Sequence, residues 1–257
     1  MESRSPYVPL QTGDGSWTLY EPERGLCFRS RFGACTEARH VFLRGTRLER
    51  YAPPWRVLEL GLGAGMNFLV TAEAFLQRYS GGLLEYHAIE RSPVSPELIE
   101  ALRYRERLEH PELVEVLCEA LARARRHPDR CPQVVLGAQG RVCLYLYPVD
   151  WRQAPVPKLA AQAVYHDPFD LKSNPECWTR ACFAWLAHRM APMGILATYG
   201  AATAARRAML RARLIIARLP GVLRKREMTV AAHRAEALAG YFILPYSRFF
   251  RSCEDAS

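Results

Sequence analysis

One short segment combines residue types that suit the binding of a nucleotide-like cofactor. Residues 55–69 read Trp-Arg-Val-Leu-Glu-Leu-Gly-Leu-Gly-Ala-Gly-Met-Asn-Phe-Leu. Glycines such as Gly61, Gly63 and Gly65 permit a positive φ and let the backbone approach a ligand closely. The helix expected from Asn67 onward would present free N–H groups behind them. A strand, a glycine turn and a helix start therefore predict a cofactor at the end of a parallel sheet.

The spacing of these glycines bears on which cofactor is bound. A dinucleotide-binding turn would read G-x-G-x-x-G, whereas here the spacing is G-x-G-x-G, with Glu59 two residues before the first glycine. This variant resembles motif I of the class I S-adenosylmethionine methyltransferases, which implies S-adenosyl-L-methionine as the cofactor. A generic strand–turn–helix junction is the alternative interpretation.

Acidic residues follow three further predicted strands. Ligands of such sheets bind beyond the carboxyl ends of the strands. Glu90 follows a strand over 83–89 and is a candidate for holding both ribose hydroxyls, the alternative being a surface acid at a loop. Asp150 follows a strand over 141–147, where methyltransferases commonly place an acid near the adenine amino group.

Asp167 follows the fourth predicted strand, over 163–166, at the reacting position of such a fold. A carboxylate there would orient an amine and accept the proton that the amine loses, because an ammonium has no lone pair for attack. A turn or helix-capping role is the alternative for Asp167. His166 and Asp170 are weaker candidates, since a histidine on a strand is more commonly packed in the core.

The length and the order of predicted elements indicate one large α/β domain with an appendage. The chain has 257 residues, of which 49% are hydrophobic and 24% charged. We expect a β-rich extension over 1–54 and the methyltransferase domain over 55–257. Repeated alternation of strands and helices predicts a doubly wound, mostly parallel sheet. Further expected elements are one helix over 175–190 with Asn174 as N-cap, and a terminal antiparallel hairpin formed by 214–219 and 223–231.

Composition restricts the class of protein and its partners. The chain has no apolar run of about 18 residues and no apolar core of a signal peptide, so we expect a cytoplasmic protein without a membrane span. None of the eight cysteines forms a C-x-x-C pair, which favours free thiols over a metal site or disulfides.

The formal net charge of +9 favours a polyanionic partner, with nucleic acid as the first candidate. Two basic clusters are candidates for contacting an RNA backbone, although solvated surface charge is an equally good interpretation of them. These clusters are Arg206 with Arg207, and Arg224 with Lys225 and Arg226.

Several segments together resemble the tRNA 5-(aminomethyl)uridine methyltransferases, which comprise the stand-alone MnmD-type enzymes and the methyltransferase half of MnmC. The matching segments are 37–43, 59–69, 86–90, 167–169, 174–178, 196–199, 206–207 and 224–228. The resemblance implies N-methylation of 5-aminomethyl(-2-thio)uridine at the tRNA wobble position, giving 5-methylaminomethyl(-2-thio)uridine. It implies tRNA, through its anticodon stem-loop, as the partner.

The resemblance also assigns roles to individual residues. It implies that Asp167 is the catalytic residue, that Gly61, Gly63 and Gly65 form the cofactor loop, and that Glu90 binds the ribose. Beside the resemblance, we predict four further cofactor-binding residues: Glu59, Asn67, Phe68 and Asp150. We also predict the substrate-binding residues Phe169, Asn174, Arg206, Arg207, Lys225 and Arg226, the four basic ones holding the anticodon stem.

The chain departs from the family pattern at a few positions. Asp170-Leu171 replaces a small residue and a proline, Lys172-Ser173 displaces a basic residue by one, and Val149 replaces a glycine. The sequence contains no flavin-binding second half, so we expect a separate enzyme to supply the aminomethyl group. Two other functions stay open: a class I methyl- or aminopropyltransferase acting on a small amine, and a catalytically inactive fold that binds RNA or protein.

Overall fold

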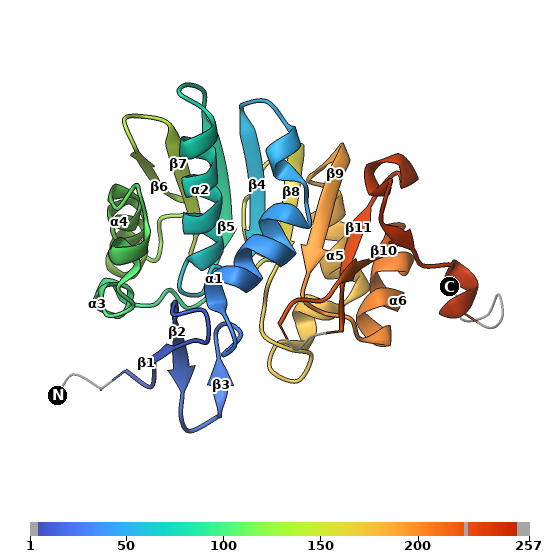
Figure 1. Cartoon of the computed structure of the whole chain (residues 1–257), viewed down its shortest axis with the longest axis horizontal. Coiled ribbons are helices and arrows are strands. Elements are labelled where there is room, and N and C mark those ends of the chain that lie inside the picture. Colours follow the sequence, from blue (N-terminus) through green and yellow to red (C-terminus); the bar gives the residue numbers. More distant parts are fainter. Residues whose placement is uncertain (1–4, 224–225, 251–257) are drawn as a thin grey trace. The chain divides into compact units, whose positions relative to one another are not determined.

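The computed structural model describes residues 5–223 and 226–250, and Figure 1 labels its helices and strands. The chain forms two compact units. The first unit contains the residues up to Arg39 together with Leu62–Pro155. The second contains His40–Gly61 and the residues from Val156 onward. The glycine loop therefore crosses from one unit to the other between Gly61 and Leu62. The sequence-based boundary between residues 54 and 55 stays a prediction.

The first unit has a small antiparallel sheet and three strands of a mixed sheet. Its strands are β1 (Val8–Gln11), β2 (Trp17–Glu21), β3 (Leu26–Cys27), β5 (Leu84–Ile89), β6 (Gln133–Gly137) and β7 (Val142–Tyr147). The small sheet has the order β1-β2-β3, and the other three strands have the order β5-β7-β6. β5 and β7 are parallel, whereas β6 returns antiparallel to β7. The carboxyl ends of β5 and β7 consequently lie at one edge.

The helices of the first unit are α1 (Ala34–Glu37), α2 (Met66–Arg78), α3 (Pro96–Glu100) and α4 (Glu112–Arg126), with a 3₁₀ turn at Tyr104–Arg107. A π-helical turn, Ala38–Arg44, follows α1. Residues on α4 that recur at helical spacing are buried, among them Leu113, Leu117 and Leu121. Because such spacing puts them on one face, α4 packs its apolar side inward and leaves its arginines at the surface.

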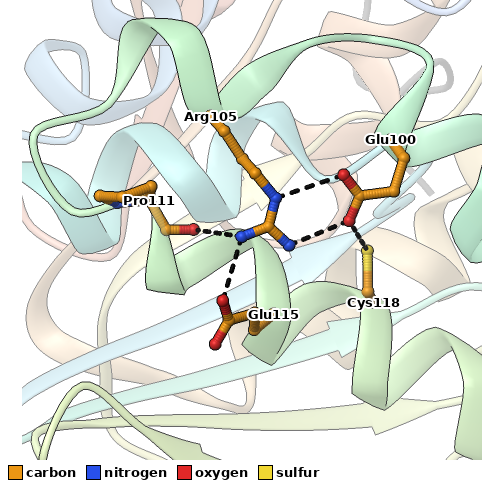
Figure 2. A network of polar contacts seen from close by, with 5 residues as sticks. All are labelled: Glu100, Arg105, Pro111, Glu115 and Cys118. Atoms are coloured by element: carbon orange, nitrogen blue, oxygen red, sulfur yellow. Dashed lines mark hydrogen bonds and ion pairs between the residues drawn. The ribbon is translucent and has the colours of Figure 1, made fainter.

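An arginine connects three elements of this unit. Figure 2 shows Arg105 between Glu100 and Glu115, with N–O distances of 3.0 Å and 3.1 Å. Its guanidinium also donates to the carbonyl oxygen of Pro111, and the Cys118 thiol donates to Glu100. Each exposed ion pair contributes little by itself. Together they hold the ends of α3 and α4 and the turn between them.

The second unit contains six strands and two α-helices within the described residues. Its strands are β4 (Trp55–Leu60), β8 (Ala161–His166), β9 (Met190–Thr198), β10 (Ile215–Pro220), β11 (Glu227–Ala232) and β12 (Phe242–Ile243). Their order is β12-β10-β11-β9-β8-β4. Its helices are α5 (Arg180–Ala187) and α6 (Thr203–Arg211), with 3₁₀ turns at Leu48–Arg50, Pro175–Trp178, Ala235–Leu238 and Tyr246–Arg248.

The registers of these strands fix which residues lie side by side. β8 runs parallel to both of its neighbours, so that Leu60, His166 and Thr198 are adjacent at the carboxyl ends of β4, β8 and β9. β11 and β10 continue the sheet antiparallel, which confirms the predicted terminal hairpin. The centre of the sheet is fully buried, as Val57 and Val164 illustrate.

Some predicted elements were wrong in detail. The helix expected over 175–190 is a 3₁₀ turn followed by α5, because Thr179 takes an extended conformation and its hydroxyl accepts from the Cys182 N–H. Asn174 makes no side-chain cap, and Met190 already belongs to β9. The second strand of the hairpin begins at Glu227 rather than 223. β6 and β1 were not predicted, because both are short strands with several exposed side chains.

None of the helices in residues 5–223 and 226–250 is both long and apolar enough to cross a membrane. The same residues contain no group of three His, Cys, Asp or Glu side chains that could hold a metal ion. Seven cysteines are free thiols, and three of them, Cys143, Cys177 and Cys182, are buried. The eighth, Cys253, lies outside the described residues.

Candidate active site

The glycine loop adopts a conformation that side chains would disturb. Gly61, Gly63 and Gly65 have φ values of 92°, 54° and 76°. A Cβ on Gly61 would lie 2.7 Å from the backbone oxygen of Asp167, and one on Gly63 would lie 3.2 Å from the Phe28 ring. Gly65 also precedes α2 in a left-handed conformation. The loop therefore brings bare backbone to the start of α2, which is what a closely bound cofactor requires.

Glu90 is fixed directly after β5. One of its carboxylate oxygens accepts the N–H of Gly63 at 3.0 Å, and the other accepts the N–H of Ser92 at 2.8 Å. Its own N–H donates to the carbonyl of Tyr147 at 3.1 Å. A carboxylate has about four acceptor positions. Two remain for a ligand, so the side chain is pre-oriented and still able to accept the two hydroxyls of a ribose.

Three other predicted cofactor residues lie in the interior. Asn67 and Phe68, in the first turn of α2, are 1% and 0% exposed, and Phe68 makes an edge-to-face contact with Tyr86 at 5.2 Å. Glu59 is fully buried on β4, opposite Tyr165 of β8. The structure therefore places all three side chains in the core, Asn67 and Phe68 in the first unit and Glu59 in the second.

Asp150 is engaged by its neighbour Arg152. The guanidinium donates from Nε at 2.7 Å and from Nη2 at 2.8 Å, and the Arg152 N–H donates at 3.0 Å. The hydrogen bond from the Arg152 side chain lowers the pKa of the Asp150 carboxyl, which keeps it ionised. An adenine amino group at this position would share the carboxylate with Arg152.

The segment containing Asp167 is held at three consecutive backbone positions. The Asp167 N–H donates to the carbonyl of Leu60 at 2.9 Å. The Tyr199 hydroxyl donates to the Pro168 carbonyl at 2.9 Å, and Nε1 of Trp178 donates to the Phe169 carbonyl at 2.8 Å. Asp167 and Phe169 are half-buried. The sequence motifs contained Tyr199 and Trp178, but nothing in the residue pattern indicated that they fix this segment.

His166, directly before Asp167, belongs to the core. It is fully buried and makes an edge-to-face contact with Trp178 at 4.6 Å. Its Nε2 lies 2.8 Å from the Cys177 carbonyl, which only accepts, so Nε2 carries the proton and Nδ1 accepts from the Thr198 hydroxyl at 3.3 Å. Burial lowers the pKa of His166 to about 4. This residue is therefore a neutral packed histidine and a poor acid–base group near neutral pH.

The residues that depart from the family pattern form a tight turn. The Asp170 carboxylate accepts the N–H groups of Lys172 and Ser173 at 3.0 Å and 2.9 Å. The Asn174 N–H donates to the Asp170 carbonyl at 2.9 Å, and Asn174 is half-buried. Hydrogen bonding to Ser173 lowers the pKa of Asp170, so the ionised carboxylate accepts hydrogen bonds within the turn.

The two arginines on α6 lie in different surroundings. Arg206 is 3% exposed; its guanidinium donates to the Thr229 hydroxyl at 3.0 Å and to the Glu227 carboxylate at 2.8 Å. Arg207 is exposed and donates to the Phe249 carbonyl. Arg226 is exposed as well. Lys225 and Arg224 lie outside the described residues, so the predicted cluster around them is not described.

Comparison with known proteins adds to this geometry. The model of a family described as S-adenosyl-L-methionine-dependent methyltransferase matches residues 112–234. The bifunctional proteins MnmC of tRNA 5-methylaminomethyl-2-thiouridine biosynthesis are similar in sequence. The protein from Polaromonas naphthalenivorans is 30% identical over 85% of this chain and 34% of its own length. The protein from Pseudomonas aeruginosa is 36% identical over 79% of this chain and 32% of its own length.

Among solved structures, MnmC2 from Aquifex aeolicus matches with a TM-score of 0.70 at 24% identity, covering 91% of this chain and 72% of that one. That likeness concerns the fold. The chain spans about a third of the length of the curated relatives it matches.

Fold, glycine loop and family model together define the class of protein: the chain is an S-adenosyl-L-methionine-dependent methyltransferase with the class I fold, as predicted. Within that class it is similar to part of the MnmC proteins, which confirms the resemblance inferred from its motifs.

Proposed function

We propose that this enzyme methylates the aminomethyl nitrogen of 5-aminomethyl(-2-thio)uridine at the wobble position of tRNA. The observation that carries the proposal is the similarity to MnmC proteins, at 30% and 36% identity, over about four-fifths of the chain. The positions of the acids support it, because Glu90 and Asp167 each directly follow a parallel strand. We further propose the cytoplasm as its location and tRNA as its partner.

The residues of the first unit fit an adenosine-containing cofactor. Gly63 and Gly65 let the loop pack closely against Phe28 and Leu117, and Glu90 retains acceptor positions for a ribose. Bound S-adenosyl-L-methionine would supply an electrophilic methyl group on sulfur. Glu90 would hold its ribose, and Asp150 together with Arg152 would lie near its base.

Asp167 is the proposed catalytic residue. Its carboxylate would orient the neutral amine of the substrate and accept a proton from it as the nitrogen–carbon bond forms and the carbon–sulfur pair returns to sulfur. The hydrogen bonds from Tyr199 and Trp178 would keep Asp167 in place for this step. The wobble base would have to leave the anticodon stack to reach the site. Phe169 and Asn174, in the same segment, would line the substrate side.

The proposal is tested by methyl transfer from labelled S-adenosyl-L-methionine to tRNA carrying 5-aminomethyluridine, with tRNA lacking that group as the control. Label is expected in the modified tRNA alone. A small polyamine is offered as a third acceptor in a parallel reaction. Label in the polyamine and in neither tRNA would overturn the proposal in favour of a small-amine transferase. Cofactor binding without transfer to any of these acceptors would favour a binding protein.

The role of Asp167 gives a first prediction. Asp167→Asn keeps the size of the side chain but removes the proton acceptor, so turnover should fall by at least about 100-fold. The dissociation constant of the cofactor, measured by calorimetry, should change by less than about twofold. Turnover of Asp167→Asn within about threefold of the wild type would show that the proton goes elsewhere.

A further inference from the structure

A basic hollow lies at the C-terminal end of α4 in the first unit. It has a volume of about 250 Å³, and it is formed by the last turns of α4, the loop after them and the first residue of β6. Its lining consists of Glu119, Arg123, Arg126, His127, Arg130 and Gln133. Three guanidinium groups against one carboxylate leave an excess of positive charge, which suits an anionic ligand.

Hydrogen bonds among the lining residues fix the backbone of the hollow, whereas Arg126 and Arg130 lie exposed at its rim. Glu119 accepts from Arg123 Nε at 2.6 Å, and Arg123 Nη1 donates to the Val134 carbonyl at 2.8 Å. Gln133 is buried and donates to the carbonyls of His127 and Arg130, which fixes the loop. At the rim, the Arg126 side chain is 63% exposed and its Nη2 lies 3.9 Å from the Glu119 carboxylate, while Arg130 and His127 are exposed as well.

The strand register puts this hollow at the edge where the cofactor residues lie. Gln133 pairs with Leu146, next to the last residue of β7, and Asp150 follows that strand. Arg125, the residue directly before Arg126, donates to the carbonyl of Pro93, three residues after Glu90, at 3.1 Å. The hollow is therefore on the same edge of the first unit as Glu90 and Asp150.

We propose that this hollow is a phosphodiester-binding subsite for the tRNA substrate, an inference that rests on the proposed function. Guanidinium groups bind phosphate oxygens through paired hydrogen bonds. Arg126 and Arg130 at the rim make these contacts, while Arg123 is oriented by Glu119. Such contacts position a nucleic acid without reading its sequence. The subsite accordingly contributes to the binding of every tRNA and leaves selection of the modified base to the catalytic residues.

The test is the double variant Arg126→Ala with Arg130→Ala, compared with Arg78→Ala. Arg78 is an exposed arginine at the C-terminal end of α2, the end away from Gly65, so the control removes a positive charge far from the cofactor edge. Binding of tRNA is measured between about 50 and 200 mM salt. For the double variant we expect about tenfold weaker binding and a slope of log Kd against log salt that is lower by about two. Cofactor binding and thermal unfolding should match the wild type.

Two results would overturn the subsite: tRNA binding by the double variant equal to that of the wild type, or a loss no greater than that of Arg78→Ala. Lost binding of polyglutamate with unchanged binding of tRNA would overturn it in favour of an acidic protein partner. Failure of the wild type to bind or methylate tRNA would overturn the proposed function and the subsite together. Methylation by the wild type with unaffected variants would overturn the subsite alone.

Discussion

At the scale of single residues, the segment that carries Asp167 is held by donors that the proposed reaction does not consume. Tyr199 and Trp178 bind consecutive carbonyls directly after it, and the Asp167 backbone packs against Gly61. Loss of one donor would let Asp167 shift with little change in the rest of the sheet. Displacements of about 1 Å in a catalytic group can cost a factor of about 100 in rate.

Tyr199→Phe should therefore lower kcat by about tenfold or more and leave the cofactor dissociation constant unchanged. Tyr241→Phe is the matched control, because the Tyr241 hydroxyl likewise donates to a backbone carbonyl, that of Gly45, at 3.0 Å. Both variants should lose about 1 kcal/mol of unfolding free energy. If the two variants lowered kcat equally, Tyr199 would have only a structural role.

His166 predicts how stability depends on pH. Its pKa is about 4 in the folded chain and about 6.5 when unfolded, so the unfolded state binds more protons between these values. The free energy of unfolding therefore does not depend on this residue's titration above pH 6.5. As the pH falls from 6.5 toward 4, protonation of the unfolded state lowers that free energy by at most about 3 kcal/mol. Urea unfolding should show that the unfolding free energy of the wild type decreases between pH 7.5 and pH 5. The same decrease should be smaller in His166→Gln. Equal losses in both proteins would assign the effect to other groups.

At the scale of the elements, Arg206 connects α6 to β11. The sequence alone makes this arginine a candidate for contacting an RNA backbone. The Arg206 side chain is 4% exposed and its guanidinium donates to Thr229 and Glu227, and the Thr229 hydroxyl donates to the Gly200 carbonyl at 2.7 Å. A hydrogen bond from Arg206 lowers the pKa of Glu227 and keeps it ionised. Arg206 therefore stabilises the junction between this helix and the sheet.

Arg206→Ala should cost about 3–5 kcal/mol of unfolding free energy, because it leaves buried polar partners without their cation. Arg207→Ala should cost less than about 1 kcal/mol, since Arg207 is exposed. Denaturant unfolding of the two variants side by side measures both values. Arg207→Ala should instead weaken tRNA binding. Wild-type stability of Arg206→Ala would exclude the structural role.

Elements that are determined by residues close together in the sequence were predictable. The strand, glycine turn and helix over residues 55–78 follow from an apolar run, positive-φ glycines and helical periodicity, all of which are local. The break at Thr179 was not predictable, because it depends on a cap and on a strand that already begins at Met190. The burial of Arg206 depends on Glu227 and Thr229, which are about twenty residues away in the chain. Long-range pairing of this kind leaves no pattern in a single sequence.

At the scale of the whole molecule, the chain carries a formal net charge of +9. Part of this charge is balanced locally, as by Glu100 and Glu115 around Arg105 (Figure 2). Exposed arginines such as Arg130 and Arg207 belong to the remainder. Net charge attracts polyanions over a distance of about the Debye length, so its effect on binding depends on ionic strength.

The net charge predicts a salt dependence of binding that distinguishes a tRNA substrate from a small amine. Neutralising phosphates releases counterions, so the tRNA dissociation constant should rise at least tenfold between about 50 and 200 mM salt. The dissociation constant of the cofactor should change by less than about twofold over that range, because the proposed site relies on backbone amides and on Glu90, whose carboxylate accepts hydrogen bonds from Gly63 and Ser92. Fluorescence titrations of both ligands at several salt concentrations measure the two slopes. A flat response for tRNA would mean that its phosphates are not neutralised by the protein, and would favour a transferase whose acceptor is a small amine.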